Sequence, residues 1–248
     1  MKLALVAIVG CAALCLALPA SGQLYNMQLT GVSGVISVDP TTGNDNVYGG
    51  FYYGKINGVA ANIVCDDAND TVGIPWTWQA AELNATQIAA NLGSTLFGTS
   101  ATAPPGAVIG VVGYAEVAGL VETMFAPGTT SAQQGELSTA IWAITSGKTS
   151  GLTGGAATYY DNAIGEYTGL SAGTAGTDAT AALAGDGNLI LYTPIDPTTG
   201  LPAHGYSQEY WTVPEGGAAL LYLLLVGLAC FGAMLFSSRN RFGKRETA

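Results

Sequence analysis

Few side chains in this sequence have the types and spacing of a reactive site, and the first such group surrounds a serine. Gly169-Leu-Ser-Ala-Gly173 matches the nucleophile elbow of α/β-hydrolases, and the triad order is completed by Asp186 or Asp196 and then His204. A nucleophile elbow joins a strand to a helix, whereas Ser171 lies in a stretch rich in Gly, Ala and Thr. With 35 glycines in the chain, such a match arises easily by chance. We therefore expect no catalytic residue and no enzymatic activity.

The single histidine limits metal chemistry. His204 has no second histidine to pair with, so a zinc ion would lack its usual ligands. It follows Pro202-Ala203 in a turn-rich segment, which indicates an exposed loop residue.

Oxygen-bearing side chains cluster where an apolar segment ends, in Cys65-Asp66-Asp67 and the nearby Asn69 and Asp70. Calcium takes six to eight oxygen ligands in flexible geometry and could use such a cluster, although the EF-hand pattern is not met. The simpler interpretation is a turn stabilised by Asp side chains, with Cys65 as a small buried apolar residue. We predict no metal and no cofactor, and calcium binding at Asp66–Asp70 stays an open alternative.

Cysteine usage excludes a disulfide within the central part of the chain. Cys11 and Cys15 lie in an N-terminal apolar run and Cys230 in a C-terminal one, which leaves Cys65 by itself. We predict that Cys65 is a buried free thiol. The tryptophans Trp76, Trp78 and Trp142 are expected in the core, and an aromatic platform for carbohydrate is the alternative.

Strand signals dominate the first part of the chain. Residues 24–65 contain short apolar runs separated by turns, and Asn57-Gly58 is a strong hairpin signal because both residues tolerate positive φ. The pentapeptide Asp-Pro-Thr-Thr-Gly occurs at 39–43 and again at 196–200, which predicts two turns of one type. Further strands are expected at 188–193 and 206–213.

Helical periodicity appears in the middle of the chain. We predict helices over 111–125 and 131–146, the second with Ser131 as N-cap and Gly147 at its end. Shorter helices are expected at 84–92 and 158–167, whereas 169–179 has the composition of a loop. The predicted fold class is mainly β with a helical insertion (α+β), an antiparallel sandwich-like ectodomain whose last strands pair with the first.

The two ends of the chain have the composition of an export signal and an anchor. Residues 1–22 combine Lys2, an apolar run and small residues before Gln23, as in a secretory signal peptide. An uncharged apolar run of 19 residues, 218–236, is long enough for a transmembrane helix. The tail 237–248 has four basic residues that should keep it cytoplasmic, namely Arg239, Arg241, Lys244 and Arg245.

Between these ends the ectodomain, residues 23–212, is strongly acidic. It contains fifteen Asp and Glu against Lys55 and Lys148, a formal net charge of −13. Such a surface repels nucleic acid and anionic lipid, so we expect neither as a partner of this domain.

The C-terminal order of motif, helix and basic tail resembles the PEP-CTERM family of bacterial surface proteins. Val213-Pro214-Glu215-Gly216-Gly217 stands where that family has Val-Pro-Glu-Pro, so Gly216 replaces the second proline. The resemblance implies that an exosortase-like membrane protease recognises and cuts this sorting motif. An uncut single-span anchor is the alternative.

A second resemblance concerns residues 48–146. The apolar segment ending in Cys65-Asp-Asp, then Gly113-Tyr-Ala-Glu-Val and Leu137-Ser-Thr-Ala-Ile-Trp142, is similar to a type of PEP-CTERM ectodomain, and distantly to thioester domains of adhesins. In those adhesins a Gln of the Trp motif is joined to a cysteine. Here Ser138 stands four residues before Trp142, and Gln133 and Gln134 lie too early, so the resemblance implies a shared fold without the covalent bond.

Together these features predict a non-enzymatic protein of the bacterial cell envelope or extracellular matrix. Its expected partners are the exosortase-like protease, the membrane through 218–236 and exopolysaccharide. A surface adhesin or carbohydrate-binding module with a permanent anchor is the alternative.

We predict that the exported protein begins at Gln23, because small residues fill the positions before it and the apolar run ends at Leu18. N-terminal sequencing of the exported chain checks this. A lipidated start at Cys11, in the lipobox-like Ile8-Val-Gly-Cys11, would contradict the assignment.

Overall fold

The computed structural model describes residues 24–213, except residues 71 and 151. The chain divides between Thr212 and Val213 into two units, and the fold below is that of the first. The predicted signal peptide, the motif residues 214–217, the predicted span 218–236 and the basic tail lie outside the described residues. Among the helices that are described, none has the length and apolar character needed to cross a membrane.

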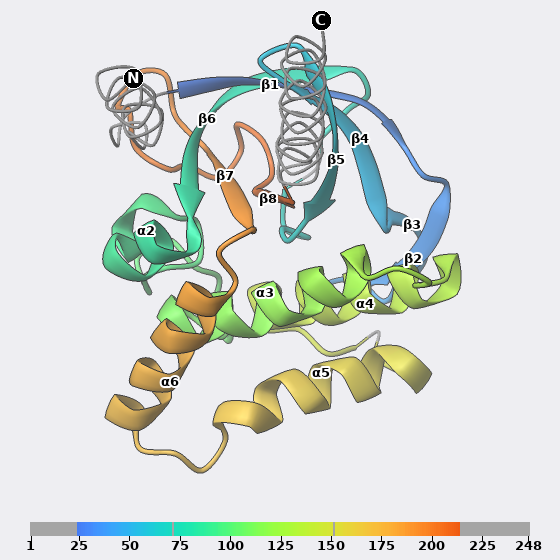
Figure 1. The fold of residues 1–248 in the computed structure, drawn as a ribbon. Helices are drawn as coiled ribbons and strands as arrows, with labels where there is room; N and C mark the ends of the chain where they lie inside the picture. Colours follow the sequence, from blue (N-terminus) through green and yellow to red (C-terminus); the bar gives the residue numbers. More distant parts are fainter. Residues whose placement is uncertain (1–23, 71, 151, 214–248) are drawn as a thin grey trace, which may run out of the picture. The chain divides into compact units, whose positions relative to one another are not determined.

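Six antiparallel strands close into a barrel in the order β1-β4-β5-β8-β7-β6 (Figure 1). The predicted sandwich is therefore wrong, and so is the mainly β composition, because the described α-helices contain more residues than the strands. The α+β class is confirmed. Strand β1 pairs with β4 on one side and β6 on the other, and a register shift between Leu29 and Gly31 bends it. The strands are β1 (Leu24–Val32), β4 (Phe51–Ile56), β5 (Val59–Cys65), β6 (Trp76–Asn84), β7 (Ile190–Pro194) and β8 (Tyr210–Thr212).

The last strands pair with the first part of the chain, as predicted, and the pairing is made by β8 with β5 rather than with β1. β8 fills the gap between β5 and β7, with Cys65 opposite Tyr210 and Leu191 opposite Trp211. It has three residues rather than the predicted eight. Strand β6 was not predicted, although apolar and polar residues alternate over much of it, which is typical of a half-buried strand.

The turns follow the local sequence as predicted. Asn57 and Gly58 join β4 to β5 with φ angles of 49° and 84°. Both Asp-Pro-Thr-Thr-Gly segments form the same turn. In each, the carboxylate of the Asp accepts a hydrogen bond of 2.7 Å from the backbone N–H two residues later. One of these turns connects β2 (Val35–Asp39) to β3 (Asn44–Gly49), which form a separate two-stranded sheet.

Residues of alternating strand positions fill the barrel interior. The buried side chains of this core are Met27, Leu29, Tyr52, Ile63, Cys65, Trp78, Ala80, Tyr192 and Tyr210. Neighbouring positions point outward to the helices, where Trp211 of β8 contacts the ring of Tyr114. Apolar side chains thus form one core inside the barrel and a second core between the barrel and the helices.

Helices cover one side of the barrel in two layers (Figure 1). α3 (Gly110–Phe125) and α4 (Ser131–Ser146) lie next to the barrel, and α5 (Gly154–Tyr167) and α6 (Ala172–Gly185) pack on them. The short α2 (Ala85–Ala90) follows β6 and precedes the 3₁₀ turn η1 (Leu92–Ser94). Each of these α-helices except α6 corresponds to a predicted helix.

Two helical details differ from the prediction. The N-cap of α4 is Thr130 rather than Ser131, because Thr130 and Gln133 form a reciprocal capping box. α6 replaces the predicted loop at 169–179. Its buried residues Ala175, Ala179 and Leu183 recur every four positions, and such small side chains give a weak periodic signal while allowing close packing on α3.

Candidate functional site

The candidate site lies where β5 ends, at residues 65–70, and where the chain enters β8, at 204–210. Helix α4 fixes this strand end: Trp142 Nε1 donates to the carbonyl of Cys65 at 3.0 Å, and Thr145 donates to the carbonyl of Asp66. On the opposite side the N–H of Asp66 donates to the carbonyl of Glu209 at 3.3 Å. Helix and strand together therefore hold the segment in one position.

Three buried carboxyl groups gather at this point, and within the described part of the chain no lysine or arginine pairs with them. Asp66, Asp67 and Glu209 are each 0 % exposed. Trp211 Nε1 donates to Asp66 Oδ2 at 2.7 Å, and Glu209 accepts from Tyr114 OH at 2.6 Å, from the N–H of Leu96 at 3.2 Å and from Thr193. Burial raises the pKa of Asp66 well above its ordinary value and that of Glu209 to about 7.

Cys65 is buried, as predicted, and its thiol shares a carbonyl acceptor with the side-chain amide of a glutamine. The thiol donates to the carbonyl oxygen of Asp67 at 3.2 Å, and Gln208 Nε2 donates to the same oxygen at 2.8 Å. Tyr210 OH donates to Gln208 Oε1 at 2.8 Å. Burial raises the pKa of the Cys65 thiol well above its ordinary value. A thiol and a polarised side-chain amide thus lie around one carbonyl oxygen.

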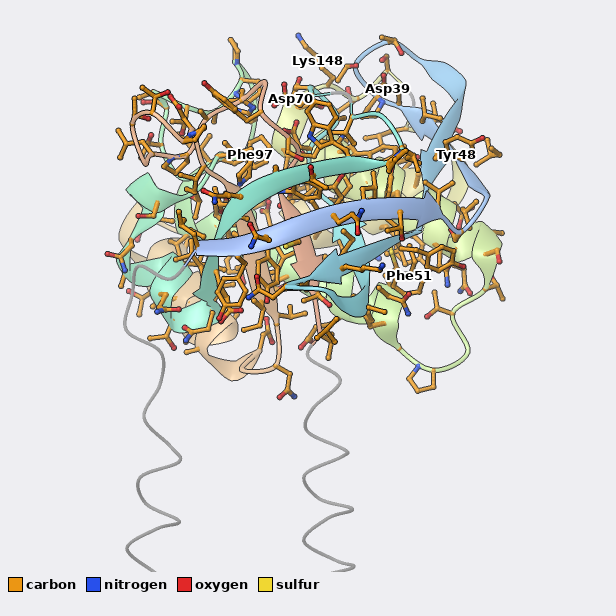
Figure 2. All side chains as sticks on the ribbon, turned by 90° about the horizontal axis from the view of Figure 1, so that it is seen from above. Asp39, Tyr48, Phe51, Asp70, Phe97 and Lys148 are labelled. Carbon is orange, nitrogen blue, oxygen red and sulfur yellow. The ribbon has the colours of Figure 1, made fainter. Side chains whose placement is uncertain are left out.

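His204 is not the exposed loop residue that was predicted. Its ring lies between Asp70 Oδ2, 2.8 Å from Nδ1, and the carbonyl of Thr102, 2.9 Å from Nε2, and Phe97 meets the ring edge-on. The neighbouring carboxylates of Asp67 and Asp70 raise the pKa of His204 to about 10. Figure 2 shows Asp70 and Phe97, the two labelled members of this group.

The hydrolase pattern does not assemble. Ser171 is exposed at the N-cap of α6, where its hydroxyl contacts the N–H and hydroxyl of Thr174. His204 contacts Asp70 and Thr102 instead. The element before Ser171 is helix α5 rather than a strand, so the elbow geometry is missing there.

The tryptophans divide between core and surface. Trp78 and Trp142 are buried, as predicted, but Trp76 is 42 % exposed and the prediction for it is wrong. Trp76 Nε1 donates to the carbonyl of Tyr206 at 3.1 Å, and both line a hollow of about 630 Å³ with Gln28 and Gln79.

The sequence alone brought together Cys65, Asp66, Asp67 and Asp70, and the predicted Asp turn is confirmed because Asp67 Oδ1 accepts from the N–H groups of Asn69 and Asp70. It missed Gln208 and Glu209 as members of the site. One signal could have found them: Gln208 and Glu209 are two polar residues directly before Tyr210-Trp211, the aromatic start of β8.

Comparison with protein-family models, with curated proteins and with solved structures found no match for this chain.

We predict that Glu209 makes the protein less stable as the pH rises. Its pKa goes from 4.5 to about 7 on folding. Between these values the folded chain keeps a proton that the unfolded chain has released, so the stabilisation is complete below 4.5 and is lost as the pH passes 7. The loss is on the order of 3 kcal/mol.

Thermal unfolding at pH 5.5 and pH 8 measures this effect. The melting temperature should fall across the interval, and Glu209→Gln should reduce the fall. Asp178→Asn, an exposed position on α6, is the matched control and should behave as the unmodified chain. An unchanged fall in Glu209→Gln would contradict the assignment.

Proposed function

We propose that this chain is an exported, non-enzymatic protein of a bacterial cell envelope, anchored by its C-terminal region and sorted by an exosortase-like protease. The observation that carries the proposal is the order of the C-terminal segments: Val213–Gly217, the apolar run 218–236 and the basic tail. A secretory signal at 1–22 and an acidic ectodomain with two lysines agree with a location outside the membrane.

The proposed cleavage site has a physical rationale. Pro214, Gly216 and Gly217 disfavour helix directly before the apolar run, so the chain there is suited to bind a protease in extended form. The released ectodomain would then reach the cell surface or the extracellular matrix, with exopolysaccharide as a further partner.

We predict that Pro214-Glu215→Ala-Ala blocks processing without blocking export. In a host with the protease, the surface form should end near Val213–Gly217, whereas the variant should stay in the membrane fraction at full length. Intact mass of both fractions is the measurement. Glu246→Ala, in the tail but outside the motif, is the control and should be cut normally. A surface form that extends through Ala248 would contradict cleavage by the protease and would support a permanent, uncut anchor instead.

A second candidate function, a surface adhesin that binds its target covalently, is favoured by the placement of Cys65 and Gln208. Ser138 stands where the adhesins have glutamine, which argues against the covalent bond at that position. Gln208 supplies an amide from another part of the chain. This amide and the Cys65 thiol both donate a hydrogen bond to the carbonyl oxygen of Asp67. Ser138 instead accepts from the N–H of Gly50 at 2.8 Å.

The chemistry would be an internal thioester. Cys65 Sγ attacks Gln208 Cδ, the C–N bond of the amide breaks, and the nitrogen leaves as ammonia with the proton of the thiol. Tyr210 OH, which donates to Gln208 Oε1, would stabilise the negative charge that develops on that oxygen. The resulting acyl group can be transferred to an amine or hydroxyl of a target, leaving Cys65 as a thiol.

If the adhesin candidate holds rather than the free thiol predicted from the sequence, the native chain is lighter than its sequence by about 17 Da, the mass of the ammonia released when the thioester forms. Intact mass spectrometry of the full exported chain under native-like and denaturing conditions tests this. Cys65→Ala and Gln208→Ala should both have the mass of their sequences, and methylamine should add to the unmodified chain only.

Gln79→Ala, an exposed glutamine on β6, is the matched control and should keep the lower mass. If the unmodified chain has its full mass and Cys65 reacts with an alkylating reagent only after unfolding, the adhesin candidate fails. Cys65 is then the unreactive buried thiol that the sequence predicted.

A further inference from the structure

Three potential ligand atoms from two distant loops converge on one point beside the Cys65 site. They are Asp67 Oδ2 and Asp70 Oδ2, from the loop after β5, and His204 Nδ1, from the loop before β8. All three atoms lie within 4.8 Å of one another. We propose that Asp67, Asp70 and His204 bind one divalent transition-metal ion of the Zn²⁺ or Mn²⁺ class.

The outer atoms of the same side chains are already fixed by backbone groups. Asp67 Oδ1 accepts from the N–H of Asn69 at 2.8 Å, and Asp70 Oδ1 accepts from the N–H of Gly205 at 3.1 Å. Each carboxylate therefore turns its other oxygen toward the common point. Such outer hydrogen bonds orient metal ligands in proteins.

The histidine is oriented in the same way. A carbonyl oxygen can only accept, so the contact of 2.9 Å between His204 Nε2 and the carbonyl of Thr102 places a proton on Nε2. Without a metal ion, Nδ1 also carries a proton, because the Asp70 carboxylate 2.8 Å away can only accept. A bound M²⁺ ion would displace that proton and take the lone pair of Nδ1, the atom that faces the two carboxylates, while Nε2 keeps its own proton. A carbonyl that holds the far nitrogen is the usual arrangement of a metal-binding histidine.

An unpartnered oxygen independently indicates a cation at this point. Asp67 Oδ2 is buried and has no hydrogen-bond partner among the described residues, and the side chain is 0 % exposed. Its distance to His204 Nδ1 is 3.6 Å, too long for a hydrogen bond. A buried carboxylate oxygen that has only this long ion-pair contact and no hydrogen bond is costly, and a metal cation at the common point would satisfy it.

The local charge agrees with a divalent ion. Asp67 and Asp70 contribute two negative charges, and the ion pairs formed among the described residues involve His204 rather than a lysine. A proton on Nδ1 would balance only one of these charges, whereas an M²⁺ ion balances both. Because one ligand is an imidazole, Zn²⁺ or Mn²⁺ fits the set better than Ca²⁺, which prefers oxygen ligands throughout.

The site is open to solvent on one side. The side chains of His204 and Asp70 are 30 % and 17 % exposed, so water can complete the coordination. Gln208 Nε2 also donates to the carbonyls of Asp67 and Asp70. A bound ion would therefore link the loop after β5 to the loop before β8 and order both, whether or not the thioester forms.

Isothermal titration of the metal-stripped, full exported chain in detergent tests the proposal, with Zn²⁺, Mn²⁺ and Ca²⁺ as separate probes. We expect one Zn²⁺ or Mn²⁺ per chain, a higher melting temperature with the ion, and weaker binding of Ca²⁺. His204→Gln and Asp70→Asn should each weaken Zn²⁺ binding by more than about 100-fold, since even outer-shell changes cost 10–100-fold.

Two control variants show whether the binding belongs to these three side chains. Asp178→Asn should bind the ion as the unmodified chain does, and so should Cys65→Ala, which removes the thioester but no proposed ligand. Circular dichroism confirms that His204→Gln is folded. Absence of Zn²⁺ and Mn²⁺ binding, or equal binding in folded His204→Gln, would overturn the proposal, and Asp67, Asp70 and His204 would then be an ion pair only.

Discussion

The burial of Asp66, Asp67 and Glu209, with no lysine or arginine of the described residues paired to them, is the constraint on which the rest of the structure depends. A buried carboxyl group is tolerated only where hydrogen-bond donors replace the lost water. Trp211, Tyr114 and the backbone N–H of Leu96 supply these donors from β8, from α3 and from the segment after η1. The carboxyl groups can therefore be buried only when β8, α3 and the segment after η1 are all folded against them.

This requirement joins the barrel to its helices. Helix α4 contributes Trp142 and Thr145 to the backbone carbonyls at the end of β5, and α3 contributes Tyr114. With Cys65 the single cysteine of residues 23–212, no disulfide holds these layers. Apolar packing and a buried polar network hold them instead. Within that network Asp66 Oδ1 and Asp67 Oδ2 have no hydrogen-bond partner among the described residues.

The same point of the fold contains the groups from which both a thioester and a metal site could form. Rigid surroundings suit such chemistry, because a thiol, an amide and three ligand atoms must keep their mutual positions. The proposed C-terminal sorting motif and anchor are a separate matter, because that proposal depends on the sequence of 213–248 alone. Destination and chemistry can therefore be tested independently.

The sequence by itself determined the local structure. Asn57-Gly58 specified a hairpin, each Asp-Pro-Thr-Thr-Gly a turn, and the periodicity around α3 and α4 two helices, because each signal depends on neighbouring residues only. Closure of the barrel, the helix α6 and the composition of the site were decided only by the tertiary structure. Gln208 and Asp67 are 141 residues apart in the sequence, and His204 and Asp70 are 134 apart. No local pattern reports such contacts, since pairing across the barrel rather than spacing along the chain sets which side chains meet.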